Sequence, residues 1–256
     1  MSDRPKVMFV SAHAVDFVIR AGGTLARYAK SGSEVTSICL TFGERQESAR
    51  LWREKSPLTL DEVKEIRRNE ALECGRLIGS QVVFYSWDDC PLLFDRPRYD
   101  QLATDIRRFR PDILITHWYQ DRTNWDHRVT AEFAMRCAQL AGAAGGILES
   151  GHVPWSPRHV FYCEPWFPFP EFCEFSPDTY VDITDVYEQK LAGLRASWSH
   201  GQLETAYGQC SEFRGYQMTR LLGRPVKYAE GFIRHWPAVG MPGLEEATVS
   251  GPRQMG

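Results

Sequence analysis

The chain has 256 residues, of which 43% are hydrophobic and 25% are charged, a composition typical of a soluble globular protein. Thirty basic and 33 acidic side chains give a net charge of −3, which disfavours a protein that binds nucleic acid or an anionic membrane. The sequence contains no apolar run approaching the ~18 residues of a membrane span, and its seven cysteines form no CxxC pairs. We therefore expect a cytoplasmic protein with reduced thiols.

Strand and helix patterns alternate through the first 140 residues. Hydrophobic periodicity and stop signals predict strands at 6–11, 34–40, 81–86 and 112–117, and helices at 24–30, 61–77, 99–109 and 126–141. This alternation predicts an α/β fold, a Rossmann-like three-layer sandwich whose sheet is mostly parallel.

The remaining residues continue with different patterns. A segment rich in proline and aromatic residues at 159–169 precedes a predicted strand at 180–183 and helices near 185–199 and 203–222. We expect a single domain over 1–256, in which about 1–145 form the core and about 146–241 form a cap with the C-terminal helices. A flexible tail is predicted for 242–256.

Polar clusters follow three of the predicted strands. His13 and Asp16 follow the first strand, Glu44 and Glu47 the second, and His127 lies after the strand at 112–117. Ligands bind at the carboxyl ends of parallel strands, so two imidazoles and a carboxylate there predict a zinc site with an open fourth position. The alternative is that the His-x-x-Asp pair arises by chance and that His127 is a capping or surface histidine.

Several motifs resemble the LmbE/PIG-L family of zinc-dependent N-deacetylases. They are Ala12-His13-x-x-Asp16, Gly22-Gly23-Thr24-Leu25, Arg67-Arg68-x-Glu70-Ala71, Asp126-His127-Arg128, Asp182-Ile183-Thr184, Lys190 and Ala229-Glu230. The resemblance covers roughly residues 6–232. It implies an LmbE-like α/β fold and His13, Asp16 and His127 as the metal ligands.

Two departures from the deacetylase pattern disfavour simple deacetylation. Val15 stands where the deacetylases carry the aspartate that activates water, and Asn124 replaces a histidine that stabilises the oxyanion. A positioned base typically contributes about 10²–10⁴-fold to the rate. The metal ligands are therefore retained while the acid–base pair is not.

A narrower branch departs in the same way, the 4-oxalomesaconate hydratases of bacterial gallate degradation. The chain resembles them in the segments 11–18 (SAHAVDFV), 42–53 (FGERQESARLWR), 124–127 (NWDH) and 228–231 (YAEG). The resemblance implies a homo-oligomeric hydratase that adds water to a conjugated carbon–carbon double bond of an unsaturated oxo-dicarboxylate or tricarboxylate. Trp166 replaces a histidine of that branch, which favours a related product of aromatic ring cleavage over oxalomesaconate itself.

This chemistry needs a base, an acid and cationic groups that bind carboxylates. Glu47 is the first candidate for the base and Glu44 the second, while Cys39 is a candidate proton donor to carbon or merely a small buried hydrophobe. We expect Asp126 to orient a ligand histidine. The candidates for substrate binding are Arg20, Arg45, Arg50, Arg53, Asn124, Arg128 and Trp166.

Two other functions remain open at this point. One is a divergent amide hydrolase of the parent family, in which Glu47 replaces the missing aspartate. The other is a catalytically silent protein that keeps zinc and binds an acidic metabolite.

Overall fold

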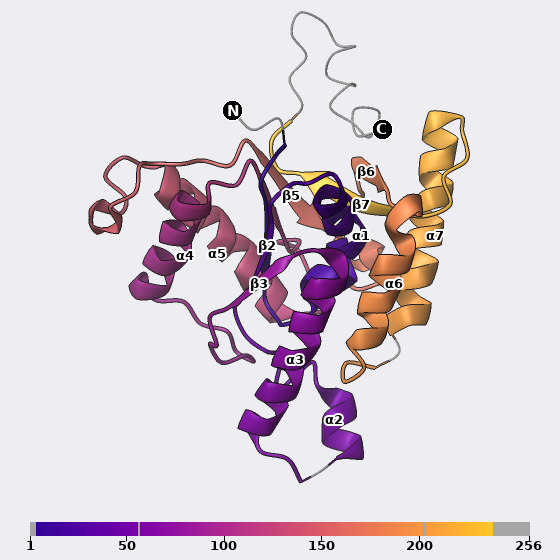
Figure 1. The fold of residues 1–256 in the computed structure, drawn as a ribbon, viewed down its shortest axis with the longest axis horizontal. Helices are drawn as coiled ribbons and strands as arrows, with labels where there is room; N and C mark the ends of the chain where they lie inside the picture. Colours follow the sequence, from indigo (N-terminus) through magenta and orange to yellow (C-terminus); the bar gives the residue numbers. More distant parts are fainter. Residues whose placement is uncertain (1–3, 56, 202, 238–256) are drawn as a thin grey trace, which may run out of the picture.

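The computed structural model describes residues 4–55, 57–201 and 203–237, so the tail predicted at 242–256 lies outside the described residues. Figure 1 shows a central sheet covered by helices on both faces. Within the described ranges, every helix is too short or too polar to traverse a lipid bilayer.

Seven strands form the sheet in the order β3-β2-β1-β4-β5-β7-β6. They are β1 (Val7–Ser11), β2 (Val35–Cys39), β3 (Gln81–Phe84), β4 (Ile113–Thr116), β5 (His159–Cys163), β6 (Thr179–Asp182) and β7 (Ala229–Arg234). The first five run parallel, and β7 pairs antiparallel with both β5 and β6. The order reverses between β1 and β4, and the carboxyl ends of β1, β2 and β4 therefore meet where α/β proteins bind ligands.

Alternate residues of β1 face two separate hydrophobic cores. Val7 and Phe9 join one core cluster, and Met8 and Val10 join the other. The first core packs against α1 (Asp16–Lys30), α3 (Leu60–Ile78), α6 (Tyr187–Ala196) and α7 (Leu203–Leu222), and the second packs against α4 (Arg96–Phe109) and α5 (Trp125–Gly142). A strand buried on both faces is typical of a parallel sheet between two helical layers, so the predicted three-layer sandwich is confirmed.

Helix α1 begins eight residues earlier than the sequence pattern predicts, because the glycine pair lies inside the helix. The helix is kinked at Ala21, with φ −141° and ψ 16°. The kink frees the N–H groups of Gly23 and Thr24, which donate to the two carboxylate oxygens of Glu230 at 2.9 and 2.8 Å. A Cβ atom at Gly23 would lie 2.6 Å from Ile183, so only glycine fits this close approach.

The segment predicted as a cap extends the central sheet instead. It supplies β5, β6 and β7, of which β5 and β7 were not predicted. The prolines and aromatic residues around β5 resemble a loop, and β7 carries Glu230 and Gly231, residues that strands disfavour. Pairing with two neighbouring strands outweighs the weak local preference of β7.

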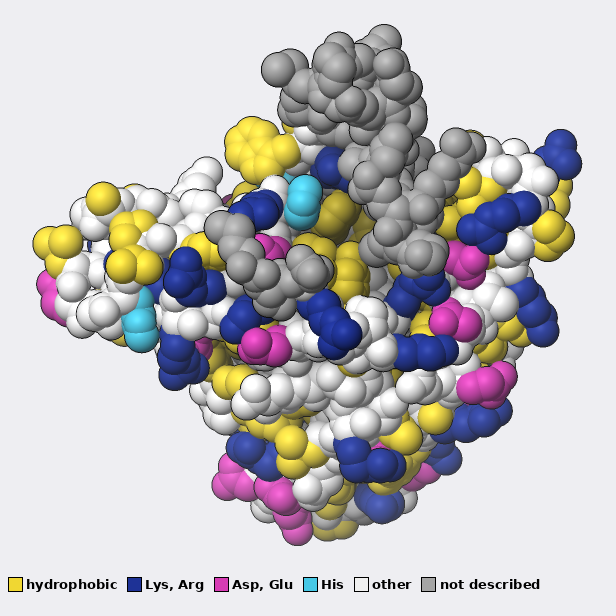
Figure 2. Space-filling model, turned by 45° about the horizontal axis from the view of Figure 1, so that its top comes forward, with side chains coloured by type: hydrophobic (Ala, Val, Ile, Leu, Met, Phe, Trp, Pro, Cys, Tyr) yellow, Lys and Arg dark blue, Asp and Glu magenta, His cyan; other side chains and the backbone are white. Residues whose placement is uncertain are grey.

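Four short elements complete the fold. Helix α2 (Ala49–Glu54) lies in a stretch for which no helix was predicted, and the 3₁₀ turns are η1 (Leu148–Ser150), η2 (Pro170–Cys173) and η3 (Thr184–Val186). Figure 2 shows basic side chains interspersed with acidic ones on one face of the molecule, as the nearly balanced charge predicts.

Candidate metal and active site

Three buried side chains and the partly buried Glu47 meet at the switch point of the sheet. His13 and Asp16 come from the turn after β1, Glu47 from the loop after β2, and His127 from the first turn of α5. One ligand atom from each lies within 4.8 Å of the others. His13 Nδ1 is 3.2 Å from Asp16 Oδ2 and 3.3 Å from Glu47 Oε1. His127 Nε2 is 3.5 Å from Asp16 Oδ1 and 3.4 Å from Glu47 Oε1.

Local hydrogen bonds hold these side chains in place. Asp16 accepts a hydrogen bond from the backbone N–H of His13 at 2.8 Å, which closes the turn between β1 and α1. Asn124 is the N-cap of α5, and its Oδ1 accepts from the N–H groups of Asp126 and His127. The capping role predicted as an alternative for His127 therefore belongs to Asn124.

Three unpaired buried atoms face one another in this cluster. His13 Nδ1, Asp16 Oδ1 and His127 Nε2 are buried without a hydrogen-bond partner among the described residues, and so is Glu47 Oε2, the oxygen of Glu47 that points away from the two histidines. Buried polar atoms are rarely left unpaired, because each costs about 1–3 kcal/mol. Two imidazole nitrogens and a carboxylate oxygen are a donor set that suits zinc or another borderline divalent cation. The residues thus fit a metal ion.

Carboxylates behind the two histidines orient their rings. Asp121 Oδ2 lies 3.0 Å from His127 Nδ1, and Asp126 Oδ2 lies 3.4 Å from His13 Nε2. In metal sites such partners direct the free ring nitrogen toward the ion. Asp126 lies where it was predicted to orient a ligand histidine, whereas Asp121 was missed because its partner is six residues away and the contact depends on the loop before α5.

The ionisable groups of the cluster shift one another's pKa values. Burial lowers the pKa of His127, but the charge of Asp16 and the hydrogen bond to Asp121 outweigh it and raise the value to about 10. Burial likewise lowers the pKa of His13, yet Glu47 and Asp16 raise it well above 6.5. Burial and Asp16 raise the pKa of Glu47, whereas the two histidines lower it, and the result lies well below 4.5. Glu47 is therefore ionised at neutral pH.

Each oxygen of Glu47 has a polar neighbour outside the predicted ligands. Asn124 Nδ2 donates to Glu47 Oε1 at 3.0 Å. His200 Nε2 lies 3.4 Å from Glu47 Oε2. His200 had no signal in the sequence, since it follows a predicted helix and belongs to none of the motifs.

Val15 offers no proton acceptor at the position where deacetylases carry a carboxylate. Its side chain is fully buried in the core cluster that contains Val7 and Phe9. Glu47, which comes from a different strand end, contacts both histidines, as Asp16 does.

The other two predicted catalytic residues lie outside the four-residue cluster. Cys39 is fully buried, its thiol donates to the carbonyl oxygen of Ala14 at 3.4 Å, and burial raises its pKa well above 9. Glu44 is also fully buried, and Lys64 Nζ lies 3.3 Å from its Oε1. Cys39 is therefore buried, as its alternative interpretation as a small hydrophobe expects, and Glu44 is not a surface charge.

Arg20 is a buried arginine among the predicted substrate-binding residues, and the charges of Asp16 and Asp121 act on it. Burial lowers its pKa, while Tyr207, Asp16 and Asp121 raise it, with a net increase. Its Nη1 donates to the carbonyl oxygen of Glu164 at 3.3 Å, and its buried Nε has no hydrogen-bond partner among the described residues.

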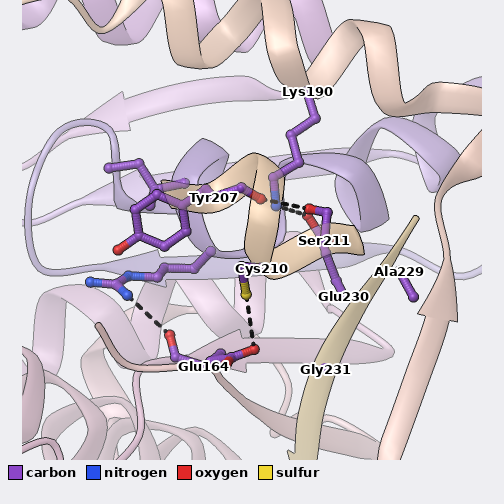
Figure 3. A pocket seen from close by; sticks show the side chains of 10 residues that line it. Glu164, Lys190, Tyr207, Cys210, Ser211, Ala229, Glu230 and Gly231 are labelled. Atoms are coloured by element: carbon purple, nitrogen blue, oxygen red, sulfur yellow. Dashed lines mark hydrogen bonds and ion pairs between the residues drawn. The ribbon is translucent and has the colours of Figure 1, made fainter. Parts of the chain in front are cut away.

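A small cavity lies behind Arg20, and its charged groups are largely paired with each other. Figure 3 shows Glu164 accepting from the thiol of Cys210, and Lys190 paired with Glu230. Arg214 also donates to both carboxylate oxygens of Glu164. These pairs connect α6 with β7, and α7 with the segment after β5, so the charged groups around the cavity hold helices against the sheet.

Apart from the buried Asn124, the remaining predicted substrate-binding residues are more exposed than Arg20. Arg45, Arg53 and Arg128 are exposed, and Arg128 lies over the ring of Trp125. Arg50 is half-buried and paired with Glu54 at 3.0 Å. Trp166 is 48% exposed and packs against Phe169.

Comparison with known proteins assigns the chain to a family. Residues 8–138 match the family model described as "PIG-L: GlcNAc-PI de-N-acetylase". The chain therefore belongs to the PIG-L/LmbE family and is an enzyme, which confirms the resemblance found in the sequence. It is 36% identical to the 4-oxalmesaconate hydratase of Pseudomonas putida over 236 residues, which cover 91% of this chain and 90% of the relative.

Solved structures agree with this assignment. The crystal structure of GalB, the 4-carboxy-2-hydroxymuconate hydratase of P. putida, aligns with a TM-score of 0.87 and 35% identity, covering 93% of this chain and 99% of GalB. The N,N'-diacetylchitobiose deacetylase of Pyrococcus horikoshii aligns with a TM-score of 0.76 and 25% identity, covering 94% of this chain and 85% of the deacetylase. Both a hydratase and a deacetylase therefore share this fold.

Proposed function

We propose that the chain is a zinc-dependent hydratase that adds water to a conjugated carbon–carbon double bond of an unsaturated oxo-dicarboxylate or tricarboxylate from aromatic ring cleavage. The observation that carries this proposal is the position of Glu47, which contacts both candidate ligand histidines while the deacetylase base position is the buried Val15. The similarity to two proteins named as hydratases supports it.

The metal ligands of this proposal are His13, Asp16 and His127. Their unpaired buried atoms and the carboxylates behind the rings are the supporting observations. When bound there, zinc supplies a Lewis acid that polarises the oxo-acid end of the substrate and favours negative charge developing on it.

Glu47 is the proposed base that takes a proton from the attacking water. Its ionised carboxylate can accept that proton, and the hydrogen bond from Asn124 holds Oε1 facing the cluster. We propose Cys39 as the donor of a proton to carbon and Glu44 as the second candidate for the base. The geometry gives these two less support, because the Cys39 thiol would have to release the carbonyl of Ala14 and Glu44 lies beside Lys64.

Arginine side chains are the proposed partners of the substrate carboxylates. Arg20 is favoured because its buried Nε lacks a partner among the described residues. The other proposed substrate contacts are Arg45, Arg50, Arg53, Asn124, Arg128 and Trp166. We also propose that the protein is a homo-oligomer. We propose that it works in the cytoplasm, in the catabolism of aromatic compounds such as gallate.

Amide hydrolysis is the second candidate function. The family model is described as a de-N-acetylase, and the deacetylase of P. horikoshii shares the fold. In this alternative, Glu47 would take over the role of the aspartate that Val15 replaces.

An ultraviolet assay of the purified protein with 4-oxalomesaconate, with and without a chelator and added zinc, tests the proposal. We expect loss of the conjugated absorbance, abolished by the chelator and restored by zinc. If the zinc-loaded protein leaves 4-oxalomesaconate unchanged but hydrates a related ring-cleavage acid, we would attribute this change in substrate preference to Trp166. Release of acetate from an N-acetyl sugar, with no hydration of any such acid, would establish the amide hydrolase instead.

A further inference from the structure

We propose that His200 is a proton relay that connects Glu47 with solvent. The inference rests on the proposed hydratase function, in which Glu47 takes the proton of the attacking water. His200 is absent from the sequence motifs and lies on the loop between α6 and α7. It acts through Glu47 and is not one of the groups proposed to contact substrate.

The two oxygens of Glu47 face different surroundings. Oε1 faces His13, His127 and the amide of Asn124, while Oε2 faces His200 Nε2 at 3.4 Å. Oε2 is buried and lacks a hydrogen-bond partner of good geometry among the described residues. The side chain of Glu47 is 9% exposed and that of His200 is 26% exposed. His200 contacts the largely buried carboxylate of Glu47 and is itself more exposed to solvent.

The buried ion pair between Arg67 and Glu70 positions both the loop that carries Glu47 and the loop that carries His200. On α3, Arg67 Nε donates to the carbonyl of Phe42 at 2.9 Å, at the start of the loop that carries Glu47. Glu70, paired with Arg67, accepts from both the backbone N–H and the hydroxyl of Ser199, at 2.8 and 2.6 Å. Because Ser199 directly precedes His200, the same pair sets the distance between the two loops.

Proton balance explains why such a relay is needed. During hydration an O–H bond of water breaks, the hydroxyl oxygen bonds to one carbon, and the proton passes to Glu47. The neighbouring carbon takes a proton from a separate acid, so Glu47 ends the reaction protonated and the acid ends it deprotonated. Glu47 regains its charge when its proton passes from Oε2 to His200 Nε2 and then to solvent, while solvent reprotonates the acid.

Variants at His200, assayed as the zinc-loaded whole chain, test the relay. For His200→Ala we expect kcat to fall about 10- to 100-fold with unchanged zinc content, and added imidazole to restore most of it in a saturable manner. His200→Gln can still donate a hydrogen bond to Glu47 but cannot pass a proton on, so it should also be slow and recover with imidazole. The matched control is His152→Ala, since His152 is an exposed histidine in the loop after η1.

The outcomes separate this inference from the proposed function. A wild-type protein without turnover of any unsaturated oxo-acid rejects the hydratase, whereas turnover that is unchanged in His200→Ala rejects the relay alone. Full activity of His200→Gln without imidazole would also overturn the relay and leave His200 as a hydrogen-bonding support.

Discussion

Individual side chains at the switch point define the chemistry that this chain can perform. The two histidines are aimed by Asp121 and Asp126, so each ring has one nitrogen in a hydrogen bond and the other free. Glu47, the proposed base, comes from the loop after β2, whereas Val15 follows β1 at the position where the deacetylases carry an aspartate.

Removing one ligand should abolish the metal site. We expect His13→Ala to lose both zinc and activity, because two of three protein ligands cannot hold zinc against chelation. Metal analysis of the purified protein by mass spectrometry measures this directly. Full zinc content in this variant would show that the metal binds elsewhere.

Removing an orienting carboxylate should weaken the site without destroying it. Asp121→Asn keeps the shape of the side chain but loses the charge next to His127 Nδ1. We expect zinc affinity to fall about 10- to 100-fold, as is typical when such partners are mutated. Competition titration with a zinc-binding dye measures the change. Wild-type affinity would mean that Asp121 only shapes the loop before α5.

Zinc binding should release protons and strengthen as the pH rises. The pKa of His127 is raised to about 10 and that of His13 lies well above 6.5, so both rings carry a proton at neutral pH and must lose it to bind metal. Below a pH of about 10, each unit of decrease should weaken affinity about tenfold for the proton of His127 alone. Calorimetry in two buffers of different ionisation enthalpy measures the released protons. Binding heats that do not depend on the buffer would contradict this expectation.

At the scale of elements, buried ion pairs connect segments that are distant in the sequence. Lys190 on α6 and Glu230 on β7 form a buried pair at 2.6 Å, and Glu230 also caps the kinked half of α1. The family landmarks at these positions are therefore structural contacts. The Arg67–Glu70 pair on α3 joins the loops after β2 and α6 in the same way.

Removing Glu230 should destabilise the fold far more than removing a surface partner. Glu230→Ala leaves Lys190 buried without a partner, and we expect a loss of about 3–5 kcal/mol in the free energy of unfolding. Glu34→Ala, which breaks the exposed pair with Lys6, is the matched control and should cost less than about 1 kcal/mol. Urea denaturation of both variants compares the two losses. Equal effects would show that the buried pair contributes no more than the exposed one.

For the whole molecule, metal binding and folding should be coupled, because the ligands come from the ends of β1 and β4 and meet only in the folded chain. Zinc at a free concentration 100 times its Kd should stabilise the protein by about 2.7 kcal/mol and raise its melting temperature. Differential scanning fluorimetry with and without a chelator measures this shift. The same shift in His13→Ala would mean that zinc stabilises the protein at another place.

Local patterns in the sequence determined much of this protein. The strands β1 to β4, the helices α3 and α4 and the candidate ligands His13, Asp16 and His127 lie in strongly patterned segments, because apolar strands and the polar residues at their ends are visible in the chain itself. The boundaries of α1 and the strands β5 and β7 were not readable, since a distant carboxylate and neighbouring strands stabilise them.

Tertiary structure alone decided the surroundings of the ligands. Asp121 behind His127, the contact of Glu47 with His200 and the pairing of Arg67 with Ser199 join segments up to 153 residues apart, and no local periodicity encodes such distances. The candidate ligands were thus identified from short motifs. The contacts of Glu47, including that with His200, and the charge at each histidine ring depend on how helices and loops pack, because electrostatic contacts form only between groups that folding brings together.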